Sequence, residues 1–399
     1  MASREPHVLV AGAGPTGLVS AVALARRGVP VTVFEALPDR ALDLRASTIH
    51  PPTMEMLETL GVMPQLLEQG LHSPYWQFRE RHGGPIAIFD LSLLKDEVRF
   101  PFRLQCEQFK VTAALLTELE KFPHATVRFN ARAHRVEQDE GGVTLSLFDR
   151  DEAFQVRGDW LIAADGAGSA IRRDLGIEFE GFTYPERFLL VSTPHDFCDR
   201  MPDLNLSNYF SDPKEWLVML RVQEFWRILF PTTLGESDAD VLDDGRIQQR
   251  LRSIAGHTQL LPVAHKTLYS VHQRVARTYR RERVLLVGDA AHINNPLGGM
   301  GMNGGIHDAM NLVEKLSQVI EGGDPALLDL YSRQRRAVAL DYVQQWTHRN
   351  REILRETNPA AREANFEELK ATAADPARAR LYLRKTSMMA SLDLARSIS

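Results

Sequence analysis

The chain has 399 residues, of which 44% are hydrophobic and 25% are charged, and its formal net charge is −5. This length and composition are typical of a globular protein with two or three lobes. The negative charge argues against a nucleic-acid-binding surface, and no apolar run reaches the roughly 20 residues that a membrane helix needs.

Cysteine usage and the N-terminal segment predict the cellular compartment. Cys106 and Cys198 have no metal-ligand spacing around them, so we expect no metal site; a disulfide between them stays open. Such sparing use of cysteine is typical of a reducing cytoplasm. The first strand begins at residue 7, which leaves no room for a signal peptide in front of it. We therefore expect a cytoplasmic protein that contacts neither membrane nor nucleic acid.

The N-terminal half predicts a β–α–β unit followed by mixed elements. A buried strand at 7–11, a helix of small residues at 15–28 and a strand at 30–35 form the unit. Further helices are expected at 52–60 and 105–121, and strands at 126–129, 133–138, 143–148 and 160–164.

The sequence pattern changes between residues 178 and 277, where strand-like runs alternate with acidic turns. Strands are expected there at 188–193, 216–222, 226–230 and 267–271. A strand at 283–287, a helix at 303–320, a long helix at 325–351 and a helical tail from residue 352 follow. We cannot decide from the sequence whether the tail packs on its own chain or on a partner.

The first motif is a glycine-rich turn between the first strand and the first helix. Gly12 permits a tight turn, Gly14 lets the backbone approach a pyrophosphate, and Gly17 lets the helix lie close to the strand. Glu35 ends the second strand, eighteen residues beyond Gly17, where it can accept hydrogen bonds from a ribose. A glycine turn without a ligand is the alternative, but this strand–turn–helix–strand–acid order favours a dinucleotide site.

The second motif is Asp165-Gly166 at the end of the strand 160–164, with Ser169 placed to cap a short helix at 170–175. On its own this pattern is structural. The third motif is Gly288-Asp289 after the strand 283–287, followed by three glycines before a helix. Asp289 can bind a polyhydroxy chain, and the exposed backbone N–H groups at the helix start can stabilise negative charge on a bound ring.

The three motifs in this order indicate an α/β fold that returns twice to hold one long dinucleotide. We predict a Rossmann-like domain in two parts, residues 1–177 and 278–350, with a sheet-rich substrate domain inserted at 178–277 and a helical segment at 351–399.

At these residues the chain resembles the single-component FAD-dependent aromatic hydroxylases, the group A flavoprotein monooxygenases that include para-hydroxybenzoate hydroxylase. The resemblance covers roughly residues 6–350, and it implies FAD as cofactor. Gly12, Ala13, Gly14, Pro15, Thr16, Gly17 and Glu35 would bind adenosine and pyrophosphate. Asp165, Gly166, Gly288, Asp289, Gly299, Gly301, Met302 and Asn303 would bind the rest of FAD.

The resemblance assigns three more residues near the flavin ring. Arg45 matches the family's flavin-contacting arginine, and Gln105 matches the glutamine that opens the helix beside the flavin. Pro296 would lie where substrate meets the isoalloxazine. In this family NAD(P)H reduces FAD, O₂ adds to give a C4a-hydroperoxide, and its distal oxygen attacks an electron-rich ring. The resemblance thus implies NAD(P)H, O₂ and a small aromatic as partners; a homodimer stays open.

The substrate side rests on residue type alone. Arg221 can pair with a substrate carboxylate and Tyr209 can help to deprotonate a phenol, but an outward-facing arginine and a core tyrosine are equally compatible with the pattern. His292 beside the third motif is expected to be structural. Other pocket candidates are His72, Tyr75, Trp216, Met219 and Trp226.

Two alternative functions remain on the sequence. One alternative is a FAD-dependent halogenase or reductase of the same fold. The halogenase is disfavoured, because Trp226-Arg-Ile-Leu-Phe-Pro231 lacks the first Trp of the halogenase Trp-x-Trp-x-Ile-Pro segment. A non-catalytic FAD-binding redox module is disfavoured by the intact loop from Pro296 to Asn303.

Overall fold

The structure is a computed structural model, and it describes residues 6–41, 46–81, 83–150, 152–256 and 258–399. Its first layer is a six-stranded sheet in the order β18-β19-β12-β1-β2-β8. The strands are β18 (Arg280–Arg281), β19 (Val284–Leu286), β12 (Trp160–Ala163), β1 (Val8–Ala11), β2 (Val31–Phe34) and β8 (Ala125–Arg128). All neighbours pair in parallel except β18 with β19. This confirms the predicted Rossmann-like α/β fold.

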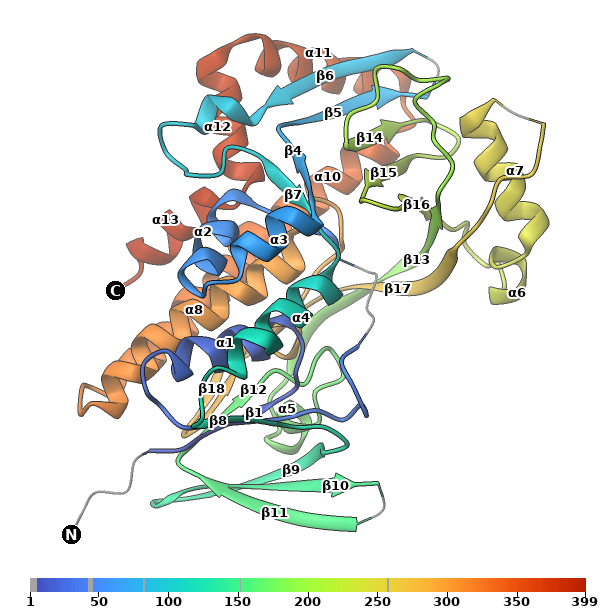
Figure 1. The fold of residues 1–399 in the computed structure, drawn as a ribbon. Helices are drawn as coiled ribbons and strands as arrows, with labels where there is room; N and C mark the ends of the chain where they lie inside the picture. Colours follow the sequence, from blue (N-terminus) through green and yellow to red (C-terminus); the bar gives the residue numbers. More distant parts are fainter. Residues whose placement is uncertain (1–5, 42–45, 82, 151, 257) are drawn as a thin grey trace.

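Helices cover one face of this sheet, and a small sheet covers the other (Figure 1). On the first face α1 (Pro15–Ala25) packs against both α4 (Gln108–Leu119) and α8 (Met300–Ile320). The second face carries a three-stranded antiparallel sheet and the short helix α5 (Ala170–Asp174). The three strands are β9 (Arg132–Asp139), β10 (Gly142–Asp149) and β11 (Glu152–Gly158).

The substrate lobe is an eight-stranded sheet in the order β20-β17-β13-β16-β15-β14-β5-β6. Five of its strands lie inside the predicted insert, namely β13 (Phe179–Thr193), β14 (Ser207–Ser211), β15 (Leu217–Arg221), β16 (Trp226–Pro231) and β17 (His265–Ala276). The other three come from outside residues 178–277. They are β5 (Tyr75–Glu80), β6 (Gly84–Asp90) and β20 (His292–Ile293), so this sheet is larger than the predicted insert.

The remaining N-terminal elements lie between the two large sheets. The strands β3 (Thr48–Ile49), β7 (Arg103–Gln105) and β4 (Leu71–Ser73) form a small antiparallel sheet. The helices α2 (Pro51–Thr59) and α3 (Met63–Gln69) follow β3, and a 3₁₀ turn spans Leu91–Leu94. On the outer side of the large sheet, α6 (Asp238–Val241) and α7 (Asp244–Ala255) cover a second apolar core that includes Phe210, Leu217 and Ile247.

The C-terminal third begins with one continuous helical run. It consists of α9 (Ala326–Val338), a π-helical turn (Ala339–Gln344) and α10 (Gln345–Arg355). Three helices follow, α11 (Pro359–Ala374), α12 (Pro376–Thr386) and α13 (Met389–Ser397). They pack on their own chain: α11 contacts β6, α12 contacts the Leu91–Leu94 turn, and α13 contacts α9 (Figure 1). In the parts of the chain described here, no helix has both the length and the apolarity to cross a bilayer.

Candidate active site

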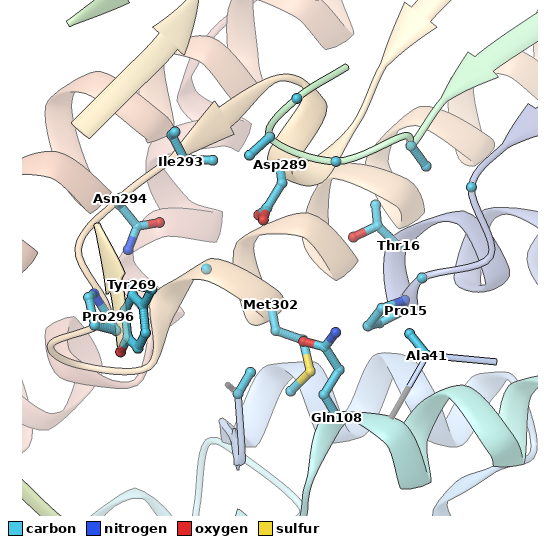
Figure 2. A pocket seen from close by; sticks show the side chains of 18 of the residues that line it. Pro15, Thr16, Ala41, Gln108, Tyr269, Asp289, Ile293, Asn294, Pro296 and Met302 are labelled. Carbon is cyan, nitrogen blue, oxygen red and sulfur yellow. The ribbon is translucent and has the colours of Figure 1, made fainter. Parts of the chain in front are cut away.

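One cavity of about 740 Å³ joins the carboxyl ends of the parallel strands to the inner face of the large sheet. Pro15 and Thr16 at the start of α1 line one end, and Pro296 and Tyr269 line the other (Figure 2). Asp289 points into the space between them. The glycine-rich turn after β1, the Asp289 turn and the large sheet therefore line one continuous cavity.

The glycine turn after β1 has the geometry that its sequence predicts. Gly12 has a φ of 103°, and a Cβ there would lie 2.4 Å from the carbonyl oxygen of Ala164. A Cβ on Gly17 would lie 2.0 Å from the carbonyl oxygen of Gly12, so only glycine lets α1 approach β1 this closely. The N-terminus of α1, the positive end of the helix dipole, faces the cavity at Gly14 and Pro15.

Glu35 is fixed at the same end of the cavity. Its Oε2 accepts a hydrogen bond of 2.7 Å from the Ala13 backbone N–H, and its Oε1 accepts one of 3.0 Å from the Leu37 N–H. The carboxylate thus holds the glycine turn while lining the cavity. The predicted contact of Glu35 with a ribose stays a prediction.

The second motif places Asp165 and Gly166 on the cavity wall. Ser169 caps α5 as predicted, because its Oγ accepts a hydrogen bond of 2.9 Å from the Arg172 N–H. Burial raises the pKa of Asp165, while hydrogen bonds from Ser169 and from the first N–H groups of α5 act in the opposite direction.

The third motif is held from behind by a buried carboxylate that the sequence analysis did not single out. Asp308 of α8 is fully buried; its Oδ2 accepts from the Gly288 N–H at 3.1 Å and contacts His292 Nε2 at 2.6 Å. Its Oδ1 accepts from Arg335 Nε at 2.6 Å. Burial alone would raise the pKa of Asp308, but His292 and Arg335 reverse this and hold the pKa below its usual value. His292 therefore has the expected structural position, and Asp289 is aimed at the cavity.

The start of α8 differs from the prediction. The helix begins at Met300 rather than at residue 303, after Gly298 and Gly299, which both have positive φ. Gly299, Gly301 and Met302 line the cavity as predicted, but the Asn303 side chain does not. Its Nδ2 donates to the carbonyl oxygens of Thr48 and Gly299, at 2.8 and 2.6 Å, and its Oδ1 accepts from the His50 N–H at 2.9 Å.

His50 completes this buried contact between β3 and the glycine turn. Its Nε2 lies 2.9 Å from the Gly298 carbonyl oxygen. Burial, together with the charge of Arg103, lowers the pKa of His50 to about 3. Asn303 and the neutral His50 ring thus fix the shape of the turn, and the predicted contact of Asn303 with FAD stays a prediction.

Gln105, which the resemblance assigned beside the flavin, does not line the cavity. Gln105 lies on β7, fully buried, where its Oε1 accepts from Thr48 Oγ1 and its Nε2 donates to Ser207 Oγ. The prediction that it opens a helix is wrong, since α4 begins at Gln108, and Gln108 lines the cavity (Figure 2). Arg45 lies outside the described residues.

The substrate half of the cavity is walled by the large sheet. Tyr209 lines it from β14, while Pro296 lines it from the loop before α8. Tyr209 also interacts with the buried Arg103 behind it; burial lowers the pKa of Arg103, and the Tyr209 hydroxyl partly offsets this. The other wall residues from this sheet are mainly apolar: Leu190, Val218, Leu220, Leu229, Tyr269 and Val271.

Arg221 lies on the opposite face of the same sheet. It is paired across strands with Trp226, and its guanidinium lies 5.8 Å from the centre of that ring, on the side of the second core. Arg227, one position after Trp226 in β16, faces the cavity and is 3% exposed. The pairing of Arg221 on β15 with Trp226 on β16 places Arg221 and Arg227 on opposite faces of the sheet, and the sequence pattern alone does not say which face meets the cavity. The remaining candidates His72, Tyr75, Trp216, Met219 and Trp226 do not line it.

Comparison with known proteins identifies the family. A family model described as "FAD binding domain" matches residues 5–346. Para-nitrophenol 4-monooxygenase from Pseudomonas sp. (strain WBC-3) is 34% identical over 361 residues, covering 89% of each chain. This chain belongs to the FAD-dependent aromatic monooxygenases. The present chain is also 32% identical to 6-hydroxy-3-succinoylpyridine 3-monooxygenase HspB from Pseudomonas putida (strain DSM 28022 / S16), over 86% of the present chain and 87% of HspB.

A solved structure agrees with the fold over nearly the whole length. The crystal structure of p-nitrophenol 4-monooxygenase PnpA from Pseudomonas putida DLL-E4 matches this monooxygenase with a TM-score of 0.90 at 31% identity, covering 95% of this chain and 98% of that chain. FAD is the cofactor, and the cavity fits it: the α1 N-terminus and Glu35 suit the ADP half, and Asp289 suits the ribityl chain. The glycine turn before α8 leaves room beside Pro296 for the ring.

Proposed function

We propose that this monooxygenase hydroxylates a small phenolic or heteroaromatic substrate with NAD(P)H and O₂. The single observation that carries this proposal is the continuity of the cavity, in which the dinucleotide end and an apolar wall with Tyr209 and Tyr269 meet at Pro296. An aromatic ring packs favourably against such a wall, and the tyrosine hydroxyls offer partners for a phenol. Relatives named for p-nitrophenol and 6-hydroxy-3-succinoylpyridine support the same substrate class.

The chain's own residues position the reactants and exclude water. FAD, when bound, accepts two electrons from NAD(P)H and activates O₂. Glu35 and the N-terminus of α1 would bind its ADP half, and Asp289 its ribityl chain. The backbone N–H groups at the start of α8 would stabilise negative charge on the ring.

Two side chains on the sheet would prepare the substrate. Tyr209 would hydrogen-bond the phenol oxygen and so favour its ionised, more electron-rich form, with the buried Arg103 guanidinium next to the Tyr209 hydroxyl. Arg227, in place of Arg221, would face the polar substituents of the substrate from β16.

The test is the oxidation of NADH and NADPH by the FAD-loaded protein across phenols, hydroxybenzoates and hydroxypyridines, with hydrogen peroxide measured in parallel. We expect one phenolic class to accelerate oxidation at least tenfold, with little peroxide and with one atom of ¹⁸O₂ in the product. Failure of every aromatic to stimulate oxidation with either nucleotide would contradict the proposal and favour a partner reductase or a non-catalytic flavin role.

A further inference from the structure

A buried polar network holds the loop that carries Pro296. Asn295 is fully buried and points away from the cavity: its Nδ2 donates to the Thr347 carbonyl oxygen at 2.9 Å, and its Oδ1 accepts from the Leu297 N–H at 2.9 Å. Its backbone N–H donates to Gln273 Oε1 at 3.2 Å. From the other side, Asn350 Nδ2 donates to the Leu297 carbonyl oxygen at 3.2 Å. The loop is thus attached to α10 at two points.

The same helical run holds the other end of this segment. Arg335 of α9 binds Asp308, and Asp308 in turn accepts from the N–H of Gly288. The residues from Gly288 to Gly299 carry both Asp289 and Pro296. The continuous helical run of α9, the π turn and α10 therefore holds both ends of this segment. Arg335 holds the end that carries Asp289, and Thr347 and Asn350 hold the end that carries Pro296.

The π turn between α9 and α10 makes this double attachment geometrically consistent. Arg335 and Thr347 are separated by twelve positions, which in an uninterrupted α-helix would place them roughly 120° apart around the axis. A π turn absorbs one extra residue, which brings the two positions to within roughly 20° of each other. The π turn at Ala339–Gln344 lies between them, so both can face the Gly288–Gly299 segment. The carbonyl oxygen of Gln344, the last residue of the π turn, accepts from Gln273 Nε2 at 3.1 Å.

We propose that the π turn sets the rotational register of this helix and that Asn295 is the positioning residue that fixes Pro296 at the junction of cofactor and substrate. The role in hydroxylation rests on the proposed function, whereas the attachment itself does not. Loss of the attachment should therefore loosen the loop whether or not a substrate has been found.

The first experiment uses Asn295→Asp in the FAD-loaded protein. Aspartate keeps the acceptor for the Leu297 N–H but loses the donor to the Thr347 carbonyl. Asn350→Leu removes the second attachment without adding charge. We expect hydrogen–deuterium exchange of the peptide spanning 293–299 to rise about tenfold in each variant, the effect of one buried hydrogen bond. Exchange of β9–β11 should not change.

The matched control is Asn311→Asp, because Asn311 also donates through Nδ2, to Gln334, but lies far along α8 from the loop. It should leave the 293–299 peptide unchanged. Unchanged exchange in both Asn295→Asp and Asn350→Leu would overturn the attachment. With a working substrate, both variants should also raise the peroxide fraction of NAD(P)H oxidation at similar FAD affinity, which a loss of global stability would not do. Faster exchange at an unchanged peroxide fraction would overturn the positioning role of Asn295.

The register itself is tested by deleting Asp341, an exposed residue of the π turn. The deletion should restore a regular helix and rotate Thr347 away from the loop. Exchange of 293–299 should then rise at least as much as in Asn295→Asp, and adding Asn295→Asp to the deletion should have no further effect, since the deletion already breaks that contact. Additive effects would show that the π turn and Asn295 act separately. If the deletion variant does not fold, the two point variants still decide the attachment.

Discussion

Arg172 and Ala290 are joined by a hydrogen bond of 2.8 Å, from Nη1 of the guanidinium to the carbonyl oxygen, although 118 positions separate them. Nη2 of the same side chain donates to the Ala167 carbonyl oxygen at 2.8 Å, and the guanidinium stacks 3.7 Å from the centre of the Phe179 ring. A single buried cation therefore connects the Asp165 turn to the Asp289 turn.

Replacing Arg172 by methionine should separate these two turns. Two carbonyl oxygens would lose charge-assisted donors, so we expect a loss of about 2–4 kcal/mol in the free energy of unfolding and at least a tenfold weaker binding of FAD. Chemical denaturation and flavin fluorescence titration measure the two effects. Arg173→Met is the comparison for the unfolding measurement only, because the Arg173 side chain is mostly exposed and bonds the Gly168 carbonyl oxygen, but it also lines the cavity.

Tyr209→Phe tests the proposed hydrogen bond that favours ionisation of the substrate phenol. We expect kcat to fall about a hundredfold with a small change in KM, because a positioned acid–base group contributes 10²–10⁴-fold. The deficit should shrink as the pH rises above the substrate's own phenol pKa, where the substrate arrives already ionised. Steady-state rates across pH with a phenol of known pKa give the answer. An equal loss at every pH would assign Tyr209 to packing instead.

Arg227→Gln and Arg221→Gln form a matched pair on neighbouring strands of one sheet. Arg227 faces the cavity, whereas Arg221 stacks beside Trp226 on the other face. We expect Arg227→Gln to raise the substrate KM about tenfold or more, and Arg221→Gln to act only on the melting temperature. The reverse result would return Arg221 to the substrate site.

Two buried neutral histidines should make the protein sensitive to mild acid. Burial lowers the pKa values of His50 and His307 to about 3. Between pH 6.5 and pH 3 these histidines are therefore protonated in the unfolded chain but neutral in the folded protein. Stability is therefore complete above the unfolded pKa near 6.5 and falls as the pH drops toward 3, by up to about 1.4 kcal/mol per pH unit for each histidine.

His307→Gln isolates one of these histidines. Glutamine can still bond Thr53 Oγ1, which His307 Nε2 contacts at 2.9 Å. We expect the loss of melting temperature between pH 6.5 and pH 4.5 to become shallower in this variant, as followed by circular dichroism in matched buffers. A pH dependence identical to that of the parent protein would contradict the buried neutral state.

The local motifs were predictable because their chemistry lies within a few residues. Gly12 and Gly17 are required by contacts inside one strand–turn–helix unit, and Ser169 caps the helix that it precedes. The start of α4 was not predictable, since Gln105 and Gln108 can both open a helix. Only the pairing of β7 with β3 and β4 decides between them.

Longer-range features left no local signal. The strands β5 and β6 join the large sheet through pairing of Tyr209 with Phe78, across more than a hundred residues, and neither strand's own pattern names its partner. Arg221 and Arg227 both occupy strand positions of ordinary alternation; the cavity face is set by how the two sheets meet. Asn303 lies in a true family motif, yet its side-chain amide forms hydrogen bonds to other parts of the protein, namely Thr48 and His50.

The short strand β20 belongs to both halves of the molecule. Its residues His292 and Ile293 follow the Asp289 turn directly, and they pair with Val275 and Arg274 of β17. Tyr269 lies on β17 as well. A substitution on β17 or β20 that reshapes the pocket for a different aromatic substrate also strains the segment from Gly288 to Gly299. Variants with altered substrate range should therefore accumulate on β15 and β16, at Val218, Leu220 and Leu229, where the pocket can diversify without disturbing the cofactor.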